Sequence, residues 1–173
     1  MKYVLGLIGL VAGLVFGNDI PDFDQKTELL LHRSIVTHGP LIPFVLFVIA
    51  SGIRAVPLRW FALGLALSFA IHLSFDLFPK GWSGFALISI PTYGWTAQWF
   101  SWTWIASSIF ACTYMALKLV RSVLDGGVFV LSLAGAFAYI SMGEDSLWRP
   151  ASALIIATAI AIPLAVRGAV SDD

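Results

Sequence analysis

The residues that could bind a metal ion are concentrated in one polar stretch between two apolar segments. Residues 19–38 read D-I-P-D-F-D-Q-K-T-E-L-L-L-H-R-S-I-V-T-H and contain three aspartates, one glutamate and two of the three histidines in the chain. Carboxylate and imidazole groups are the side chains that bind divalent metals such as Zn and Mn. No other part of the sequence is comparably polar, so this stretch is the first candidate for a functional site.

The third histidine lies in an apolar segment, in the motif S-F-A-I-H-L-S-F-D at 68–76. His72 and Asp76 are four residues apart, a spacing that places both side chains on one face of a helix. Ionisable side chains inside a membrane helix are costly, and they usually face the protein interior and mark function. The pair is therefore a second candidate part of the site; the alternative is an internal hydrogen-bonded pair that stabilises the helix bundle.

The composition indicates an integral membrane protein. The chain has 173 residues, of which 59% are hydrophobic and 12% charged, and its mean hydropathy is +0.90. It is much more apolar than an average soluble domain. Its formal net charge is zero, so nucleic acid is not an expected partner. The single Cys112 excludes an internal disulfide.

The fold class that we predict is all-α, an integral membrane bundle of about six helices that forms one domain over residues 1–173. The apolar segments are 3–17, 41–53, 58–78, 99–119, 127–142 and 151–166, with an interfacial loop or short helix at 82–98. Residues 17–80 would carry the site and 99–167 would form a scaffold. The first segment, at about 1.5 Å per residue, is shorter than a ~30 Å hydrocarbon core, and a secretory signal is its alternative interpretation.

The order of the helices predicts that the histidines converge. If the first helix leads to the polar stretch and the second leads away from it, the third returns and brings His72 and Asp76 to the same membrane face. A slight excess of Lys and Arg predicts that the N-terminus is cytoplasmic and the site lies across the cell (inner) membrane. Five tryptophans fall on the site side and suggest an aromatic belt: Trp82, Trp95, Trp99, Trp102 and Trp148.

Six side chains are the candidate metal ligands: Asp22, Asp24, His32, His38, His72 and Asp76. Three histidines with carboxylates favour Zn, with Mn or Fe as further choices. A calcium loop is not expected, because the glycine and the distal glutamate of the EF-hand pattern are absent. As alternatives, the aspartates would form a solvated turn around Pro21, the first two histidines would cap the loop, and Arg33 would extend to lipid phosphate.

Three motifs resemble those of a known family. P-D-F-D at 21–24, H-R-S-I-V-T-H at 32–38 and H-L-S-F-D at 72–76 resemble the membrane-bound metal-dependent hydrolases of the YdjM type, a DUF457-like family. The resemblance covers about the first half of the chain. It implies that the six candidate ligands form a metal site with Arg33 and Thr37 beside it, and that the activity is hydrolytic.

Two functions are consistent with these residues. The first is a metal-dependent hydrolase acting on a phosphate ester or lipid-linked phosphate, in which Asp22 or Asp24 is the general base, Arg33 binds the phosphate and Asp76 orients His72. The second is a metal-binding membrane protein, transporter or assembly subunit without catalysis, in which His72 and Asp76 act as a relay or an ion-coordination step. In both cases the lipid bilayer is a partner.

Overall fold

The computed structural model describes residues 1–26, 30, 32–79 and 86–170, and within them it confirms an all-α membrane helical bundle. The α-helices are α1 (Lys2–Asp19), α2 (Leu41–Gly52), α3 (Val56–Asp76), α4 (Gln98–Lys118), α5 (Val123–Ile140) and α6 (Trp148–Val170). Two 3-10 helices follow α1 and α5: η1 (Pro21–Lys26) and η2 (Ser141–Gly143). The predicted apolar segments match these helices closely.

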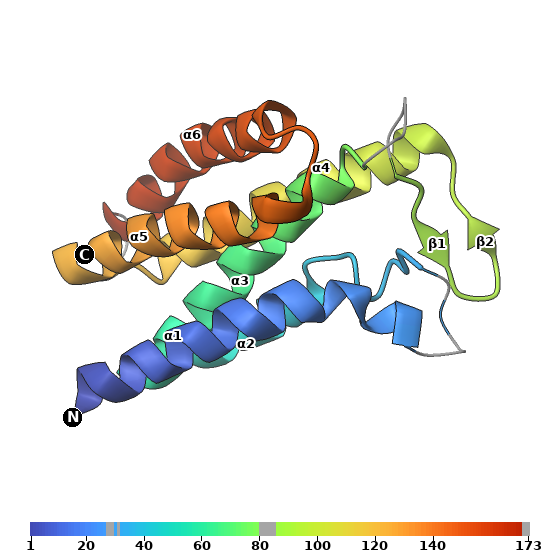
Figure 1. The fold of residues 1–173 in the computed structure, drawn as a ribbon. Helices are drawn as coiled ribbons and strands as arrows, with labels where there is room; N and C mark the ends of the chain where they lie inside the picture. Colours follow the sequence, from blue (N-terminus) through green and yellow to red (C-terminus); the bar gives the residue numbers. More distant parts are fainter. Residues whose placement is uncertain (27–29, 31, 80–85, 171–173) are drawn as a thin grey trace.

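Helix α3 is the centre of the bundle. It contacts α1, α2, α4, α5 and α6, and Figure 1 shows it between α1 and α2 on one side and the later helices on the other. Its residues from Ala62 to Ile71 are all buried, which is expected for a helix that is apolar on every side. Pro57 lies in its first turn, where a missing backbone N–H costs nothing. The C-terminal end of α3 is therefore held rigidly, and this end carries His72 and Asp76.

Helices α1 and α3 run parallel and approach each other closely through glycines. A Cβ added to Gly17 would lie 2.5 Å from the carbonyl oxygen of Leu65, and one added to Gly64 would lie 2.6 Å from that of Leu10. Gly9 and Gly13 contact the backbone of α3 in the same way. Small residues at this spacing let two membrane helices pack backbone to backbone. We call this contact the glycine seam.

Four of the helices are long and apolar enough to cross a membrane, namely α1, α3, α5 continued through η2, and α6 up to Arg167. They identify the chain as a membrane protein. Helix α2 has only 12 residues, or roughly 18 Å. Helix α4 has 21 residues but is not among the four, since its tryptophans and hydroxyl side chains lower its hydropathy. The sequence alone predicted that α4 would be a span like the others.

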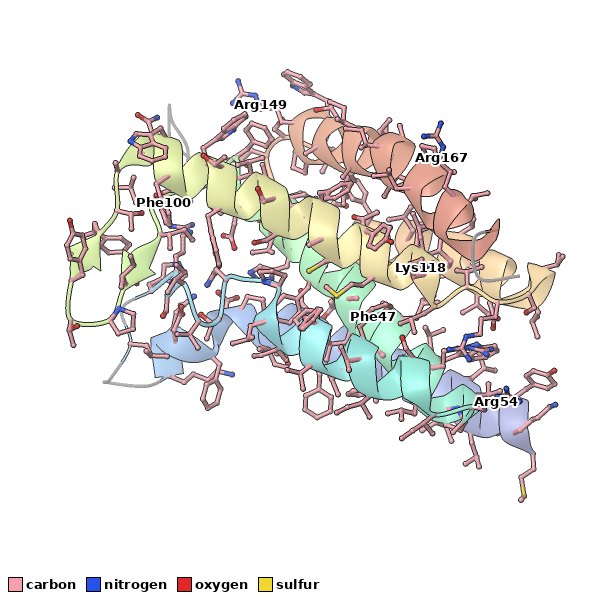
Figure 2. All side chains as sticks on the ribbon, turned by 180° about the vertical axis from the view of Figure 1, so that it is seen from behind. Phe47, Arg54, Phe100, Lys118, Arg149 and Arg167 are labelled. Atoms are coloured by element: carbon pink, nitrogen blue, oxygen red, sulfur yellow. The ribbon has the colours of Figure 1, made fainter. Side chains whose placement is uncertain are left out.

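The turns of the bundle gather at two ends. Both chain termini lie at the end opposite the strands β1 (Ser89–Ile90) and β2 (Gly94–Trp95), as Figure 1 shows. In Figure 2, Arg54, Lys118 and Arg167 lie toward the end with the termini, and Arg149 lies toward the other. Trp95, Trp99, Trp102 and Trp148 are 44% to 73% exposed, which suits the predicted aromatic belt; Trp82 lies outside the described residues.

One buried carboxylate fixes the end that holds the termini. Asp125 is buried on α5, where it accepts hydrogen bonds from Arg59 Nη2 at 2.8 and 3.0 Å and from Trp60 Nε1 at 2.7 Å. It also accepts one from the Arg121 backbone N–H. These contacts join α5 to the start of α3, at the opposite end of α3 from His72.

Candidate metal centre

The loop before α2 is organised around the carboxylate of Asp24, which lies in η1 and is 1% exposed. Its Oδ2 accepts hydrogen bonds from the backbone N–H of Ser34 and from Thr37 Oγ1, both at 2.8 Å. Its Oδ1 lies 3.4 Å from His32 Nδ1, and its Oδ2 lies 3.3 Å from His38 Nδ1. One carboxylate therefore holds both ends of the 32–38 loop.

These contacts keep the Asp24 carboxylate charged. Burial would raise its pKa, but the hydrogen bonds from His38, from the Ser34 N–H and from Thr37 outweigh burial and lower the pKa below its usual range. With both oxygens engaged inside the loop, Asp24 acts on the site by orienting histidines. The sequence-based hypothesis gave it two further roles, those of a metal ligand and a general base.

His38 is fully buried, and contacts to both its side chain and its backbone hold it in place. Its Nδ1 lies 3.1 Å from Thr37 Oγ1, and its backbone carbonyl accepts a hydrogen bond from Trp104 Nε1 of α4 at 2.9 Å. Burial would lower the pKa of His38, but the carboxylates of Asp24 and Asp76 outweigh it and raise that pKa to about 9. An imidazole whose Nδ1 faces a carboxylate presents Nε2 as its ligand atom.

Three residues from separate elements bring ligand atoms together here. Asp22 of η1, His38 of the loop and His72 of α3 each offer a ligand atom, and these atoms lie within 4.8 Å of one another. The ring centroids of His38 and His72 are 6.1 Å apart. The convergence of His38 and His72 that the helix order predicted is confirmed.

The fourth candidate ligand at this point is Asp76. Its Oδ2 lies 3.2 Å from His38 Nε2 and 3.3 Å from His72 Nε2. Two ligand atoms bound tetrahedrally to one zinc ion are about 3.3 Å apart, given metal-ligand distances of about 2.0–2.1 Å. Within the described residues, His38 Nε2 and Asp76 Oδ2 are both buried and lack a hydrogen-bond partner. The spacing of these two atoms and their lack of hydrogen-bond partners fit a shared metal ion.

Asp22 and His32 lie at the rim of this cluster. The side chain of Asp22 is 44% exposed, with Oδ1 bonded to Gln25 Nε2 at 2.7 Å and Oδ2 3.9 Å from His72 Nε2. The side chain of His32 is 39% exposed, and its ring centroid lies 5.9 Å from that of His38. His32 does not belong to the group of three ligand atoms found among the described residues.

Arg33 adopts a left-handed backbone conformation, with φ at 57°, which L-residues with a side chain seldom occupy. The β1 strand holds it there: Ser89 N–H donates to the Arg33 carbonyl at 2.9 Å, and Ile35 N–H donates to the Ser89 carbonyl at 2.8 Å. The Arg33 side chain donates from Nε to Asp76 Oδ1 at 3.3 Å. Arg33 thus lies directly beside the metal cluster.

A polar cavity of about 610 Å³ opens onto the cluster. Its wall includes Asp22, His32, Arg33, His72 and Asp76. Four of the six predicted ligands, and Arg33 beside them, are thereby reachable by a solute, whereas His38 and Asp24 do not line the cavity. The cavity has the size of a small-molecule site.

Two positioning residues were missed from the sequence alone. Ser89 lies in the segment interpreted as an interfacial loop or short helix, and the turn residues P-T-Y-G at 91–94 were the available signal for a hairpin. Trp104 was assigned only to an apolar span. Its indole N–H, which needs a partner when buried, carried no sign of which residue it would meet.

The chain was compared with family models, with curated proteins and with solved structures, and none of them matches it. The resemblance of the three motifs to the YdjM-type hydrolases stays a prediction. The geometry of the site is therefore the basis for assigning a function.

Proposed function

We propose that this protein is a membrane-embedded metal-dependent hydrolase of phosphate esters. The observation that carries the proposal is the pair of buried, unsatisfied ligand atoms, His38 Nε2 and Asp76 Oδ2, beside a cavity that also contains Arg33. Structural metal sites are usually closed, whereas catalytic sites keep a position open to substrate. The exposure of Asp22 and the open cavity favour the catalytic kind.

The ligands would be Asp22, His38, His72 and Asp76, with zinc favoured and manganese or iron as further choices. When bound, such an ion polarises the phosphoryl oxygen and lowers the pKa of the attacking water. Asp24 orients His38 through Nδ1 at 3.3 Å. A carboxylate behind a ligating imidazole fixes the ring and raises its basicity.

Proton transfer would fall to residues exposed in the cavity. Asp22 retains the role of general base if it is not a ligand, because its carboxylate is 44% exposed. His32 is the second candidate, since Asp24 Oδ1 lies 3.4 Å from its Nδ1 and its ring borders the cavity. A histidine oriented by a carboxylate on one nitrogen can accept or deliver a proton at the other.

Arg33 would bind the substrate phosphate. Its Nε is engaged with Asp76 at 3.3 Å, and the rest of the guanidinium is available in the cavity wall for a planar, bidentate contact. The same contact to Asp76 places the phosphate next to the ligands. A lysine at position 33 would keep the positive charge but could not make the planar, bidentate contact.

The test is a purification in detergent, followed by metal analysis by mass spectrometry and by assay of p-nitrophenyl phosphate and bis-p-nitrophenyl phosphate. We expect close to one equivalent of metal and turnover in the wild type, with both lost in His72→Ala and His38→Gln. Asp145→Asn, an exposed carboxylate change at the same end of the bundle, is the matched control. Bound metal without turnover would reject the hydrolase function and favour the alternative, a metal-binding membrane protein without catalysis.

A further inference from the structure

A second cavity lies next to the polar cavity, along the membrane-spanning part of the bundle. This groove measures about 350 Å³ and lies between α1 and α5. Asn18, Tyr139 and Ile140 line both the groove and the polar cavity. The two spaces are therefore adjacent, and these three side chains lie where they meet.

The groove is bordered by small or apolar side chains away from the polar cavity, and by Asn18, Asp19 and Tyr139 at or near it, with Ser68 of α3 between the two walls. Val11 and Val15 of α1 are 58% and 54% exposed, because the glycine seam turns the opposite face of α1 toward α3. On α5 the wall begins with the small residues Gly135 and Ala136 and continues to Tyr139 and Ile140, and a Cβ added to Gly135 would meet nothing within 4 Å. The small side chains at 135 and 136 leave the groove open at that level.

The helices that form the groove are suited to contact lipid tails. Both of its walls belong to helices that are long and apolar enough to span a membrane, and lipid hydrocarbon surrounds such helices. From Val11 to Asn18 the helix rises by roughly 10 Å. A hydrocarbon chain lying along this length would end where the polar cavity begins, within reach of Arg33 and the metal cluster.

We propose that the substrate is a lipid phosphate whose hydrocarbon chain lies in the α1–α5 groove while its phosphate enters the polar cavity. This inference rests on the proposed hydrolase function and specifies its substrate class. In the reaction, water supplies an oxygen that bonds to phosphorus, the phosphorus–oxygen bond to the lipid breaks, and the lipid oxygen leaves with a proton. Water is the only co-reactant.

The groove can be filled without touching the metal cluster. In Gly135→Leu the new side chain occupies the space between α1 and α5. Gly127→Leu is the matched control, because Gly127 lies on the same helix, also has nothing within 4 Å of an added Cβ, and is not part of the groove. Both proteins are compared with the wild type on p-nitrophenyl phosphate, and on long-chain phosphatidic acid and phosphatidylglycerol in mixed micelles.

We expect Gly135→Leu to reduce kcat/KM for the long-chain lipids at least tenfold while the rate on p-nitrophenyl phosphate stays within about twofold of the wild type. Gly127→Leu should change neither. An equal fall on both substrate classes, or an unchanged lipid rate, would overturn the groove assignment. Turnover of the soluble ester but of no lipid would reject the lipid substrate and leave the hydrolase function intact; turnover of neither would reject the function.

A binding measurement tests the groove independently of catalysis. A phosphatidic acid with a photoactivatable group on its acyl chain is crosslinked to the wild type, and the labelled peptides are mapped by mass spectrometry. Labelling should concentrate on residues 11–18 and 135–140, and Gly135→Leu should abolish it. Labelling spread evenly over the outer faces of α5 and α6 would show only bulk lipid contact and would contradict the proposal.

Discussion

His38 Nε2 lies 3.2 Å from Asp76 Oδ2, and neither atom has a hydrogen-bond partner within the described residues. The two residues come from different elements, the loop before α2 and the last turn of α3. Buried polar atoms are nearly always satisfied, so this arrangement requires a further group between them or a proton shared by them. Its response to pH and to metal distinguishes these two states.

Metal affinity should rise with pH. The folded-state pKa of His38, about 9, lies above the ordinary value of 6.5, so protonation stabilises the metal-free fold fully below pH 6.5 and this contribution is lost as pH rises through 9. A metal must displace that proton. Titration with a chelating dye should show about a tenfold gain in zinc affinity per pH unit between pH 6.5 and 9. An affinity independent of pH would contradict the assignment.

Asp24→Asn should weaken metal binding without removing a ligand. The neutral amide accepts more weakly than the carboxylate at the oxygen that faces Ser34, Thr37 and His38, so the His38 ring is held less firmly and is less basic. Loss of such a supporting carboxylate typically costs about 10- to 100-fold in metal affinity. Competition against a zinc chelator measures this, with Asp145→Asn as the control. An unchanged affinity would show that Asp24 only shapes the loop.

The glycine seam should tolerate no added bulk. In Gly64→Leu the Cβ alone would lie 2.6 Å from the carbonyl oxygen of Leu10 and 3.2 Å from the backbone nitrogen of Leu14. Overpacking of this kind costs about 1–3 kcal/mol, so the thermal unfolding temperature in detergent should fall. Gly52→Leu provides the comparison, because an added Cβ there meets nothing within 4 Å. Equal melting temperatures for both variants would argue against close contact between α1 and α3.

Asp125→Ala should separate stability from metal binding. The substitution leaves Arg59 and Trp60 without their shared acceptor, and breaking a buried ion pair costs about 3–5 kcal/mol. The variant should unfold at a lower temperature. Its metal content at low temperature should equal that of the wild type, since Asp125 lies at the far end of α3 from His72. A proportional loss of metal would indicate that the two ends are coupled.

The bundle and the meeting of the histidines could be predicted from the sequence because they depend on hydropathy and on helix order. Apolar runs gave the helices to within a few residues, and an up-and-down path placed His72 beside His38. The polar stretch at 19–38 and the four-residue spacing of His72 and Asp76 together singled out the six candidate ligands. The helices follow from the lengths of the apolar segments, and the meeting of the histidines follows from the alternating direction of successive helices.

The separate roles of the site residues could not be predicted from hydropathy and helix order. Asp22 and Asp24 are two residues apart and chemically identical, yet one is exposed at the cavity and the other is buried beneath the loop. That difference depends on the 3-10 turn of η1 and on the tertiary contact with Thr37. The seam was missed for another reason: the glycines at 6, 9, 13 and 17 were treated as part of an apolar run, although their spacing is typical of close helix packing.

The glycine seam also sets the reach of Asp22. Helix α1 ends at Asp19 and η1 begins at Pro21, so the position of Asp22 is determined by how far α1 is advanced along α3. A slide of one helical turn would move Asp22 by about 5.4 Å relative to His72, enough to take it out of range of a common ion. The backbone contact of Gly17 with Leu65 thus sets the distance between Asp22 and His72. The geometry of the metal centre therefore depends on residues that do not contact it.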